Sequence, residues 1–166
     1  MRQKIAGAFM AGYYGMPDKT VEAWRNLWFH TGDAGIVDAA GLLVFVDRLK
    51  DCIRRRAENI CASEVEAVIL QLAGVQEVAA YAVPSPSPGA EDEVTLAIVK
   101  TASAELDEKS VLAHADSSLP RFAQPRFVRF VESLPKTATG KVQRAVLGSQ
   151  GSAGAFDREG AKPRRI

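Results

Sequence analysis

Cysteine and histidine are scarce in this sequence. Its 166 residues include two cysteines and two histidines. Two cysteines make neither a disulfide framework nor the Cys and His spacing of a zinc site. His30 and His114 are too few and too isolated for a metal centre. We therefore expect no metal site, and thiols at Cys52 and Cys61 in a reducing cytoplasm.

Long apolar runs and an excess of one charge are also absent. No run approaches the ~20 apolar residues of a membrane span, and the apolar run near Arg2 and Lys4 is too short for a signal peptide. The 21 basic and 20 acidic residues leave a net charge of +1. This balance favours neither nucleic acid nor an anionic membrane as a partner. With 47% hydrophobic residues, the composition is typical of a globular chain with one domain, or one domain and part of another.

The first part of the chain has β-rich runs but too few apolar residues for a core of its own. Pro17 begins a short helix. The runs 35–38 and 42–46 flank a turn that contains Gly41, and this pattern is typical of a β-hairpin. These segments resemble the end of a larger domain.

A polar run, DRLKD at residues 47–51, follows the second strand of this hairpin and is the best candidate for a domain boundary. We predict three parts. They are residues 1–47, the end of a larger domain, residues 48–147, a small domain, and residues 148–166, a flexible tail rich in glycine and serine.

The small domain alternates strands and helices. Residues 52–61 predict a tight hairpin, and Ser63 with Glu66 forms the capping box of a helix. The other predicted elements are strands at 75–83, 94–99 and 127–131 and a helix at 106–119. The order predicts an α+β fold, in which helices cover a three-stranded mixed sheet beside the two-stranded hairpin.

Three ordered motifs carry the chemistry. They are WFHTGD at residues 28–33, DRLKD at 47–51 with RAENI and EVE after it, and LPKTATGKVQR at 134–144. In this order and spacing they resemble the adenylate-forming superfamily, which contains acyl-CoA synthetases, luciferases and peptide-synthetase adenylation domains. The resemblance covers about residues 8–147. Within that superfamily, the run FVDRLKDCI at 45–53 most resembles crotonobetaine/carnitine-type CoA ligases.

The resemblance implies roles for three residues near the boundary. Asp33 would bind the ribose of ATP and of the acyl-adenylate, since a carboxylate can accept both hydroxyls in charge-assisted bonds. Arg48 would contact the ribose and phosphate side of the nucleotide, and Lys50 would be the hinge of the small domain. From the residues alone, Asp33 is equally a turn aspartate, Arg48 a surface partner of Asp47 or Asp51, and Lys50 an exposed linker lysine.

Lys141 is the catalytic residue that the resemblance implies. Gly140 lets the loop turn sharply, so that the lysine can enter the cleft of another domain. There it would bridge the substrate carboxylate and the α-phosphate of ATP during adenylation. A solvated loop lysine remains an alternative because Lys136 lies close by. A Walker loop is excluded, because Pro135 and Val142 stand where glycine and Ser/Thr are needed.

The hairpin at 52–61 would face the pantetheine tunnel in this family. The residues concerned are Arg56, Ala57, Glu58 and Asn59, and the arginines would meet the phosphates of CoA. A solvated hairpin is an equal alternative, and three arginines are too small a footprint for nucleic acid. Ala57 departs from the usual glycine, and its methyl group obstructs close backbone approach. CoA as the acceptor therefore stays open.

The predicted function is the mobile C-terminal domain of an AMP-forming acyl-CoA ligase. The complete enzyme would use ATP, Mg²⁺ and CoA to convert an acid to acyl-CoA, AMP and pyrophosphate. We expect none of these bound to the chain alone, which would be inactive or nearly so without the large N-terminal domain. One alternative is a non-catalytic module that self-associates through residues 8–46 or serves as a partner subunit. Another keeps the fold but changes the acceptor.

Overall fold

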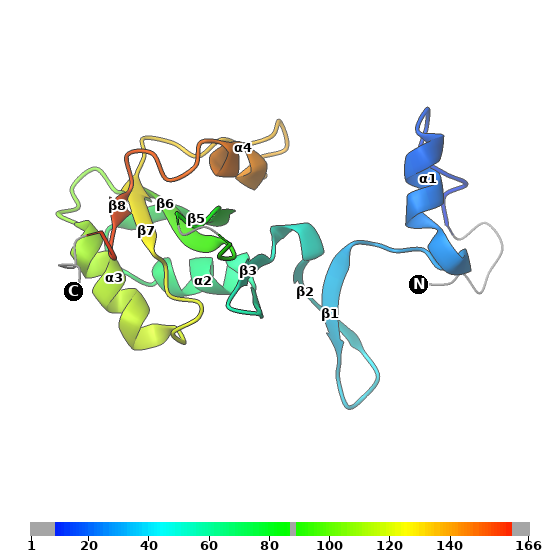
Figure 1. Cartoon of the computed structure of the whole chain (residues 1–166), viewed down its shortest axis with the longest axis horizontal. Helices are drawn as coiled ribbons and strands as arrows, with labels where there is room; N and C mark the ends of the chain where they lie inside the picture. The colour runs from blue at the N-terminus through cyan, green and yellow to red at the C-terminus, as the bar shows by residue number, and fades with distance from the viewer. Residues whose placement is uncertain (1–8, 87–88, 161–166) are drawn as a thin grey trace. The chain divides into compact units, whose positions relative to one another are not determined.

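The computed structural model describes residues 9–86 and 89–160 (Figure 1). The chain divides after Lys50 into two compact units. We call the part up to Lys50 the amino-terminal unit and the part from Asp51 the carboxy-terminal unit, and each is described by itself. No helix in the described ranges has both the length and the apolar character needed to cross a membrane.

The amino-terminal unit begins with a short helix and an aromatic cluster. Helix α1 (Pro17–Ala23) starts at the predicted proline, where a missing backbone N–H costs nothing. A 3₁₀ turn (Arg25–Leu27) follows. The rings of Phe9, Trp24 and Phe29 pack together with centroids 5.2–5.7 Å apart. These three rings hold the segments on either side of the helix together.

The predicted hairpin of this unit is confirmed. Strand β1 (Asp33–Val37) pairs antiparallel with β2 (Leu43–Arg48). The two strands form a separate two-stranded sheet. Five of its apolar side chains are 51–65% exposed, and they are Ile36, Val37, Leu43, Val44 and Phe45. This hairpin therefore contributes little to a core.

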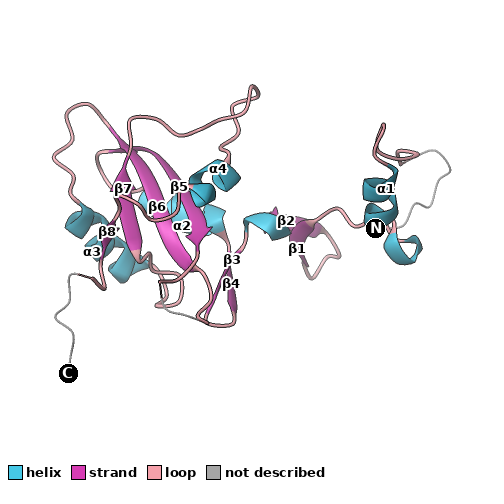
Figure 2. Cartoon of the chain, turned by 45° about the horizontal axis from the view of Figure 1, so that its top comes forward, coloured by secondary structure: helices cyan, strands magenta, loops and turns pink. Residues whose placement is uncertain are grey.

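The carboxy-terminal unit has the predicted α+β architecture (Figure 2). A 3₁₀ turn, Leu49–Asp51, leads into it. Its elements are β3 (Ile53–Arg55), β4 (Glu58–Ile60), α2 (Ala62–Ile69), β5 (Val75–Val83), β6 (Glu93–Lys100), α3 (Glu108–Ser118), β7 (Phe127–Phe130), α4 (Arg144–Ser149) and β8 (Phe156–Asp157). Strands β3 and β4 form the tight hairpin expected from the sequence. The main sheet has the order β5-β6-β7-β8, and only the β6–β7 pair is parallel.

The main sheet buries both of its faces, because alternate residues of a strand point to opposite sides. One apolar cluster joins α2 and α3 to Val78, Ala80, Leu96 and Ile98. A second cluster on the other face joins Leu147 of α4 to Ala79, Tyr81, Val83 and Ala97. Helices α2 and α4 therefore pack against opposite faces of one sheet.

Two sequence predictions about this unit need correction. Helix α2 begins at Ala62 with Cys61 as its N-cap, and no side-chain hydrogen bond caps it. The predicted cap, Ser63, lies within the first turn, where its hydroxyl contacts the Cys61 thiol at 3.1 Å. The carboxylate of Glu66 instead accepts the backbone N–H of Ala80 at 2.8 Å. A partner distant in the sequence therefore takes the place of the local capping box.

The sheet has four strands rather than three, and the segment 148–160 is not the flexible tail expected. Strand β8 pairs antiparallel with β7 at the edge of the sheet. Its Asp157 forms a two-pronged ion pair with Arg126, with N–O distances of 3.1 and 3.2 Å. Arg158 donates through Nη2 to both carboxylate oxygens of Asp116 on α3. Charged contacts, which composition does not reveal, hold this segment in place. The end of the predicted tail, 161–166, lies outside the described residues.

Asp157 gives this docking a dependence on pH. Burial by itself raises the pKa of the Asp157 carboxyl, but hydrogen bonds from Arg126 and from the backbone of residues 159 and 160 outweigh it and lower the pKa below its ordinary value. The ionised carboxylate therefore stabilises the fold above about pH 4, and this contribution is lost as the pH falls further.

We predict that Asp157→Asn lowers the free energy of unfolding by about 0.5–1 kcal/mol at pH 7, a size that allows for solvent screening of the partly exposed carboxylate. Urea unfolding at pH values from 7 to about 3 measures this deficit, which should shrink below about pH 4. Glu105→Gln, at an exposed site before α3, is the matched control and should leave stability unchanged. A deficit that persists undiminished at low pH would contradict the assignment.

Candidate functional site

The two predicted nucleotide ligands lie together at the base of the β1–β2 hairpin. Asp33 and Arg48 are paired residues in the register of the two strands. The Arg48 Nε lies 2.9 Å from an Asp33 carboxylate oxygen, and Arg48 Nη1 donates to the carbonyl of Thr31 at 3.2 Å. Arg48 therefore pairs with Asp33 on the neighbouring strand, a partner that was not considered from the sequence.

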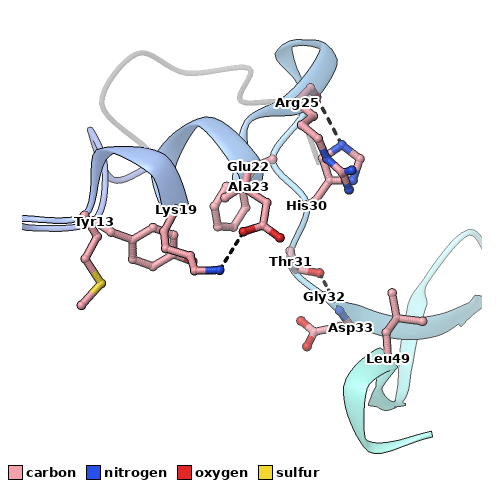
Figure 3. A pocket seen from close by; sticks show the side chains of 12 residues that line it. Tyr13, Lys19, Glu22, Ala23, Arg25, His30, Thr31, Gly32, Asp33 and Leu49 are labelled. Carbon is pink, nitrogen blue, oxygen red and sulfur yellow. Dashed lines mark hydrogen bonds and ion pairs between the residues drawn. The ribbon is translucent and has the colours of Figure 1, made fainter.

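A hollow of about 700 Å³ opens beside this pair within the amino-terminal unit (Figure 3). Its lining includes Tyr13, Lys19, His30, Thr31, Asp33 and Leu49. Figure 3 shows the Asp33 carboxylate pointing to the side of the hollow where Lys19 and Glu22 form an ion pair. The volume is within the usual range for a small-molecule site, and Asp33 presents an acceptor to it.

Lys50, the predicted hinge, stands at the division between the units. It is exposed and lies in the 3₁₀ turn that leads into the carboxy-terminal unit. The division of the chain falls directly after it. An exposed residue at such a point can change its backbone angles without disturbing a packed core.

Lys141 lies on a short, internally bonded turn. Lys136 and Val142 form a β-bridge at its base, and Thr137 N–H donates to the Lys141 carbonyl at 2.8 Å. Gly140 has a φ of +81°, a conformation that favours glycine. The turn therefore has a defined backbone, and residues 136–141 on it are all exposed.

The two lysines of this turn have different surroundings. The Lys136 ammonium lies 2.6 Å from the carboxylate of Glu77 on β5. Within the described ranges, no ion pair or side-chain hydrogen bond engages the Lys141 ammonium. Lys136 thus anchors the turn, and Lys141 is the cation that remains available for another group.

A residue to which the sequence assigned no role anchors the other end of the turn. Arg144, the first residue of α4, contacts both carboxylate oxygens of Glu66 on α2 at 2.8 and 2.9 Å. A longer contact, from its Nη1 to the Asp51 carboxylate, is 3.6 Å. Glu66 is the last residue of the second sequence motif, and Arg144 is the last residue of the third. Their positions in the motifs were the only sequence signal that could have indicated a role for Arg144.

The arginine triplet of the β3–β4 hairpin does not act as one patch. Arg55 is buried, with its Nε 2.6 Å from the Glu93 carboxylate, and it also donates to the carbonyls of Phe122 and Gln124. Arg54 pairs with Glu91 at 3.3 Å. Arg55 is therefore part of the scaffold and is not one of the arginines that could meet the phosphates of CoA.

The tip of this hairpin has an unusual backbone. Arg56 and Ala57 have φ values of 54° and 62°, as the tight turns of two-residue hairpins require. The carboxylate of Glu91 accepts the Ala57 N–H at 2.7 Å. This hydrogen bond, together with Arg54, lowers the pKa of Glu91 despite the opposing effect of burial. Arg56, Ala57, Glu58 and Asn59 are all exposed.

The histidines have backbone partners. The Nε2 of His114 lies 3.0 Å from the carbonyl of Val68, and the Nε2 of His30 lies 3.2 Å from the carbonyl of Arg25. In residues 9–86 and 89–160, no three His, Cys, Asp or Glu side chains are grouped to hold a metal ion.

The class of protein is defined by three features together, which are the mixed sheet, the tight β3–β4 hairpin and the exposed turn with Gly140 and Lys141. This class is the carboxy-terminal domain of an adenylate-forming enzyme. Residues 64–141 match the family model for the AMP-binding enzyme C-terminal domain. The chain belongs to this family and to the adenylate-forming superfamily.

Named relatives are similar along most of this chain. The long-chain-fatty-acid–CoA ligase FadD13 of Mycobacterium tuberculosis is 38% identical over 141 residues, which are 85% of this chain and 27% of that protein. ATP-bound MatB from Rhodopseudomonas palustris superimposes with a TM-score of 0.76 at 35% identity, over 84% of this chain and 28% of that one. The amide bond synthetase McbA from Marinactinospora thermotolerans gives 0.72 at 31% identity, over 85% and 28%.

The chain spans about a quarter of the length of the relatives it matches. The similarity therefore concerns the fold and the superfamily. The crotonobetaine/carnitine-type sub-family stays a prediction.

We predict that Ala57→Gly stabilises the protein by about 0.5–1 kcal/mol. Relief of the left-handed alanine is worth about 1–2 kcal/mol, and the greater freedom of glycine in the unfolded chain offsets part of it. Urea unfolding measures the change. The matched control is Ala113→Gly at an exposed site of α3, which should cost about 1 kcal/mol. A loss of stability at both sites would show that the tip is not strained.

Proposed function

We propose that this chain is the mobile C-terminal domain of an AMP-forming acyl-CoA ligase. In the complete enzyme, a carboxylate oxygen of the acid attacks the α-phosphorus of ATP, and pyrophosphate leaves. The thiol of CoA then attacks the carbonyl carbon of the acyl-adenylate, the proton of the thiol goes to solvent, and AMP leaves. The acid itself stays unassigned, because the acyl pocket would belong to the large N-terminal domain.

The exposed ammonium of Lys141 carries this proposal. Lys141 stands on a turn anchored at both ends, by Lys136 to Glu77 and by Arg144 to Glu66. Between the attacking carboxylate and the α-phosphate, its charge would offset the negative charge that accumulates during adenylation. Such a group is useful only in a cleft that another part of the protein supplies. We therefore expect the chain alone to have little or no ligase activity.

Asp33 and Arg48 support the nucleotide side of the proposal. Asp33 presents a carboxylate to the hollow, and Arg48 holds that carboxylate from the neighbouring strand. A carboxylate in this position suits the two hydroxyls of a ribose. Mg²⁺ and the phosphate-binding loop would belong to the large domain, which is the partner we propose.

Lys50 would let one small domain serve both half-reactions. Rotation at this residue would withdraw Lys141 after adenylation and bring the β3–β4 hairpin to the thioester site. Arg56 would then be the hairpin's outward cation for the phosphates of CoA, beside Ala57, Glu58 and Asn59. Ala57 would place a methyl group where CoA passes. The identity of the acyl acceptor is therefore the part of the reaction that these residues determine least.

A second candidate function rests on the exposed apolar hairpin β1–β2. The side chains that it exposes would favour burial against another surface. In this alternative, the chain is a non-catalytic module that pairs with a second copy or with a partner subunit. The two candidates differ in whether a ligase large domain restores chemistry. A cytoplasmic location fits either candidate and stays a prediction.

The first test is complementation in trans. The chain is mixed with the large domain of a related ligase, ATP, CoA and a panel of acids, and pyrophosphate release is measured. Lys141→Ala should lower the rate by about 10²–10³-fold, the usual cost of removing one group that stabilises transition-state charge. Lys136→Ala, the matched control, should lower it only a few-fold. Absence of activity with the unchanged chain, or equal losses for both lysines, would favour the non-catalytic alternative.

A second test addresses the ribose. In the same assay, the unchanged chain should use 2′-deoxy-ATP about tenfold or more less efficiently than ATP, because one charged hydrogen bond is worth about 1.5–3 kcal/mol. Asp33→Ala should reduce activity with ATP and abolish this discrimination. Asp18→Ala, on exposed α1, is the control and should preserve it. Discrimination that survives in Asp33→Ala would remove Asp33 from the ribose site.

A further inference from the structure

Glu66 and Arg144 join helices that pack on opposite faces of the main sheet. Glu66 belongs to α2, whose apolar side chains enter the first cluster, whereas Leu147 of α4 enters the second. The sheet begins with β5, so this strand is an edge of the described sheet. The ion pair between Glu66 and Arg144 therefore passes around the edge of β5.

The same carboxylate also bonds the edge strand itself. One oxygen of Glu66 accepts the N–H of Ala80 on β5 at 2.8 Å and contacts two nitrogens of Arg144 at 2.9 and 3.2 Å. Only 15% of the Glu66 side chain and 22% of the Arg144 side chain are exposed. A pair that is this well shielded and doubly bonded is stronger than an ordinary surface salt bridge.

The pair lies next to the base of the Lys141 turn, at its carboxy-terminal end. Arg144 follows Gln143, whose N–H donates to the carbonyl of Pro135 at 2.8 Å and so closes the base of the turn. The Arg144 guanidinium also approaches Asp51, the residue directly after Lys50, at 3.6 Å. One side chain thus links α2, the base of the Lys141 turn and the first residue of the carboxy-terminal unit.

We propose that Arg144 is a positioning residue for Lys141. Its ion pair with Glu66 around the edge of β5 holds the 135–143 segment in one arrangement, with Lys141 pointing outward. Its contact with Asp51 keeps that residue with the carboxy-terminal unit, so that rotation is confined to Lys50. This role rests on the proposed function, because Arg144 acts on the reaction through Lys141.

The first experiment uses the chain by itself and needs no activity. Amide hydrogen exchange is measured at Gln143, which reports the base of the turn, and at Ile98, which reports the buried centre of β6. In Arg144→Gln, protection at Gln143 should fall about tenfold or more, equivalent to ~1.4 kcal/mol, and protection at Ile98 should change much less. Glu66→Gln keeps an oxygen for the Ala80 N–H and should give the same pattern, which provides a second variant if Arg144→Gln does not fold.

Arg158→Gln is the matched control. It removes another arginine ion pair of this unit, in which Arg158 Nη2 donates to both oxygens of Asp116, and should leave Gln143 as protected as in the unchanged chain. Unchanged protection at Gln143 in a folded Arg144 or Glu66 variant would overturn the proposal. An equal loss of protection at Gln143 and Ile98 would also overturn it, because the pair would then support the whole fold rather than the turn.

The second experiment measures the reaction in the complemented ligase. Arg144→Gln should lower kcat for pyrophosphate release about tenfold with KM for ATP unchanged, and Arg144→Lys should recover part of the loss. Thioester formation from preformed acyl-adenylate should be unaffected, because Lys141 has then left the site. A uniform loss in both half-reactions would contradict a positioning role. If no large domain restores activity, the proposed function fails, whereas the exchange result still decides whether Arg144 orders the turn.

Discussion

The ion pair between Glu66 and Arg144 is the interaction on which the placement of α4 and of the Lys141 turn depends. Apolar packing orients α2 against one face of the sheet and α4 against the other, but burial is non-directional. The charged pair around the edge of β5 relates one helix to the other. Because Glu66 also accepts the Ala80 N–H, the same contact satisfies a group on an edge strand that would otherwise face solvent.

Arginine and lysine have different roles in this unit. Arg55, Arg126 and Arg144 are held in ion pairs that join separate strands and helices, a use that suits a planar group with several fixed donors. Lys141 has one compact charge on a flexible stem, which suits delivery to a ligand. A stem of this kind has about 2 kcal/mol of rotamer entropy, so a backbone ordered in advance reduces what remains to be fixed on binding.

The amino-terminal unit leaves much of its apolar surface exposed, unlike the carboxy-terminal unit, which buries both faces of its sheet. Its aromatic cluster of Phe9, Trp24 and Phe29 is internal, whereas the apolar residues of β1 and β2 are largely exposed. A two-stranded hairpin is marginal by itself. The exposed strands and the position of Asp33 at the start of β1 fit a segment whose apolar surface is covered by more protein. In the proposed ligase, that protein is the large domain that also completes the nucleotide site.

The sequence by itself determined the α+β class, both hairpins, the strand at 75–83 and the turn that exposes Lys141. Each of these depends on local patterns, such as alternation along a strand or a glycine at a positive φ. Only the tertiary structure decided the burial of Arg55 and the docking of β8. It also decided the partner of Glu66, which is 78 residues away in the chain. A charged side chain pairs with whichever opposite charge the fold brings close to it. The local hydrophobic pattern of the sequence does not indicate which partner that will be.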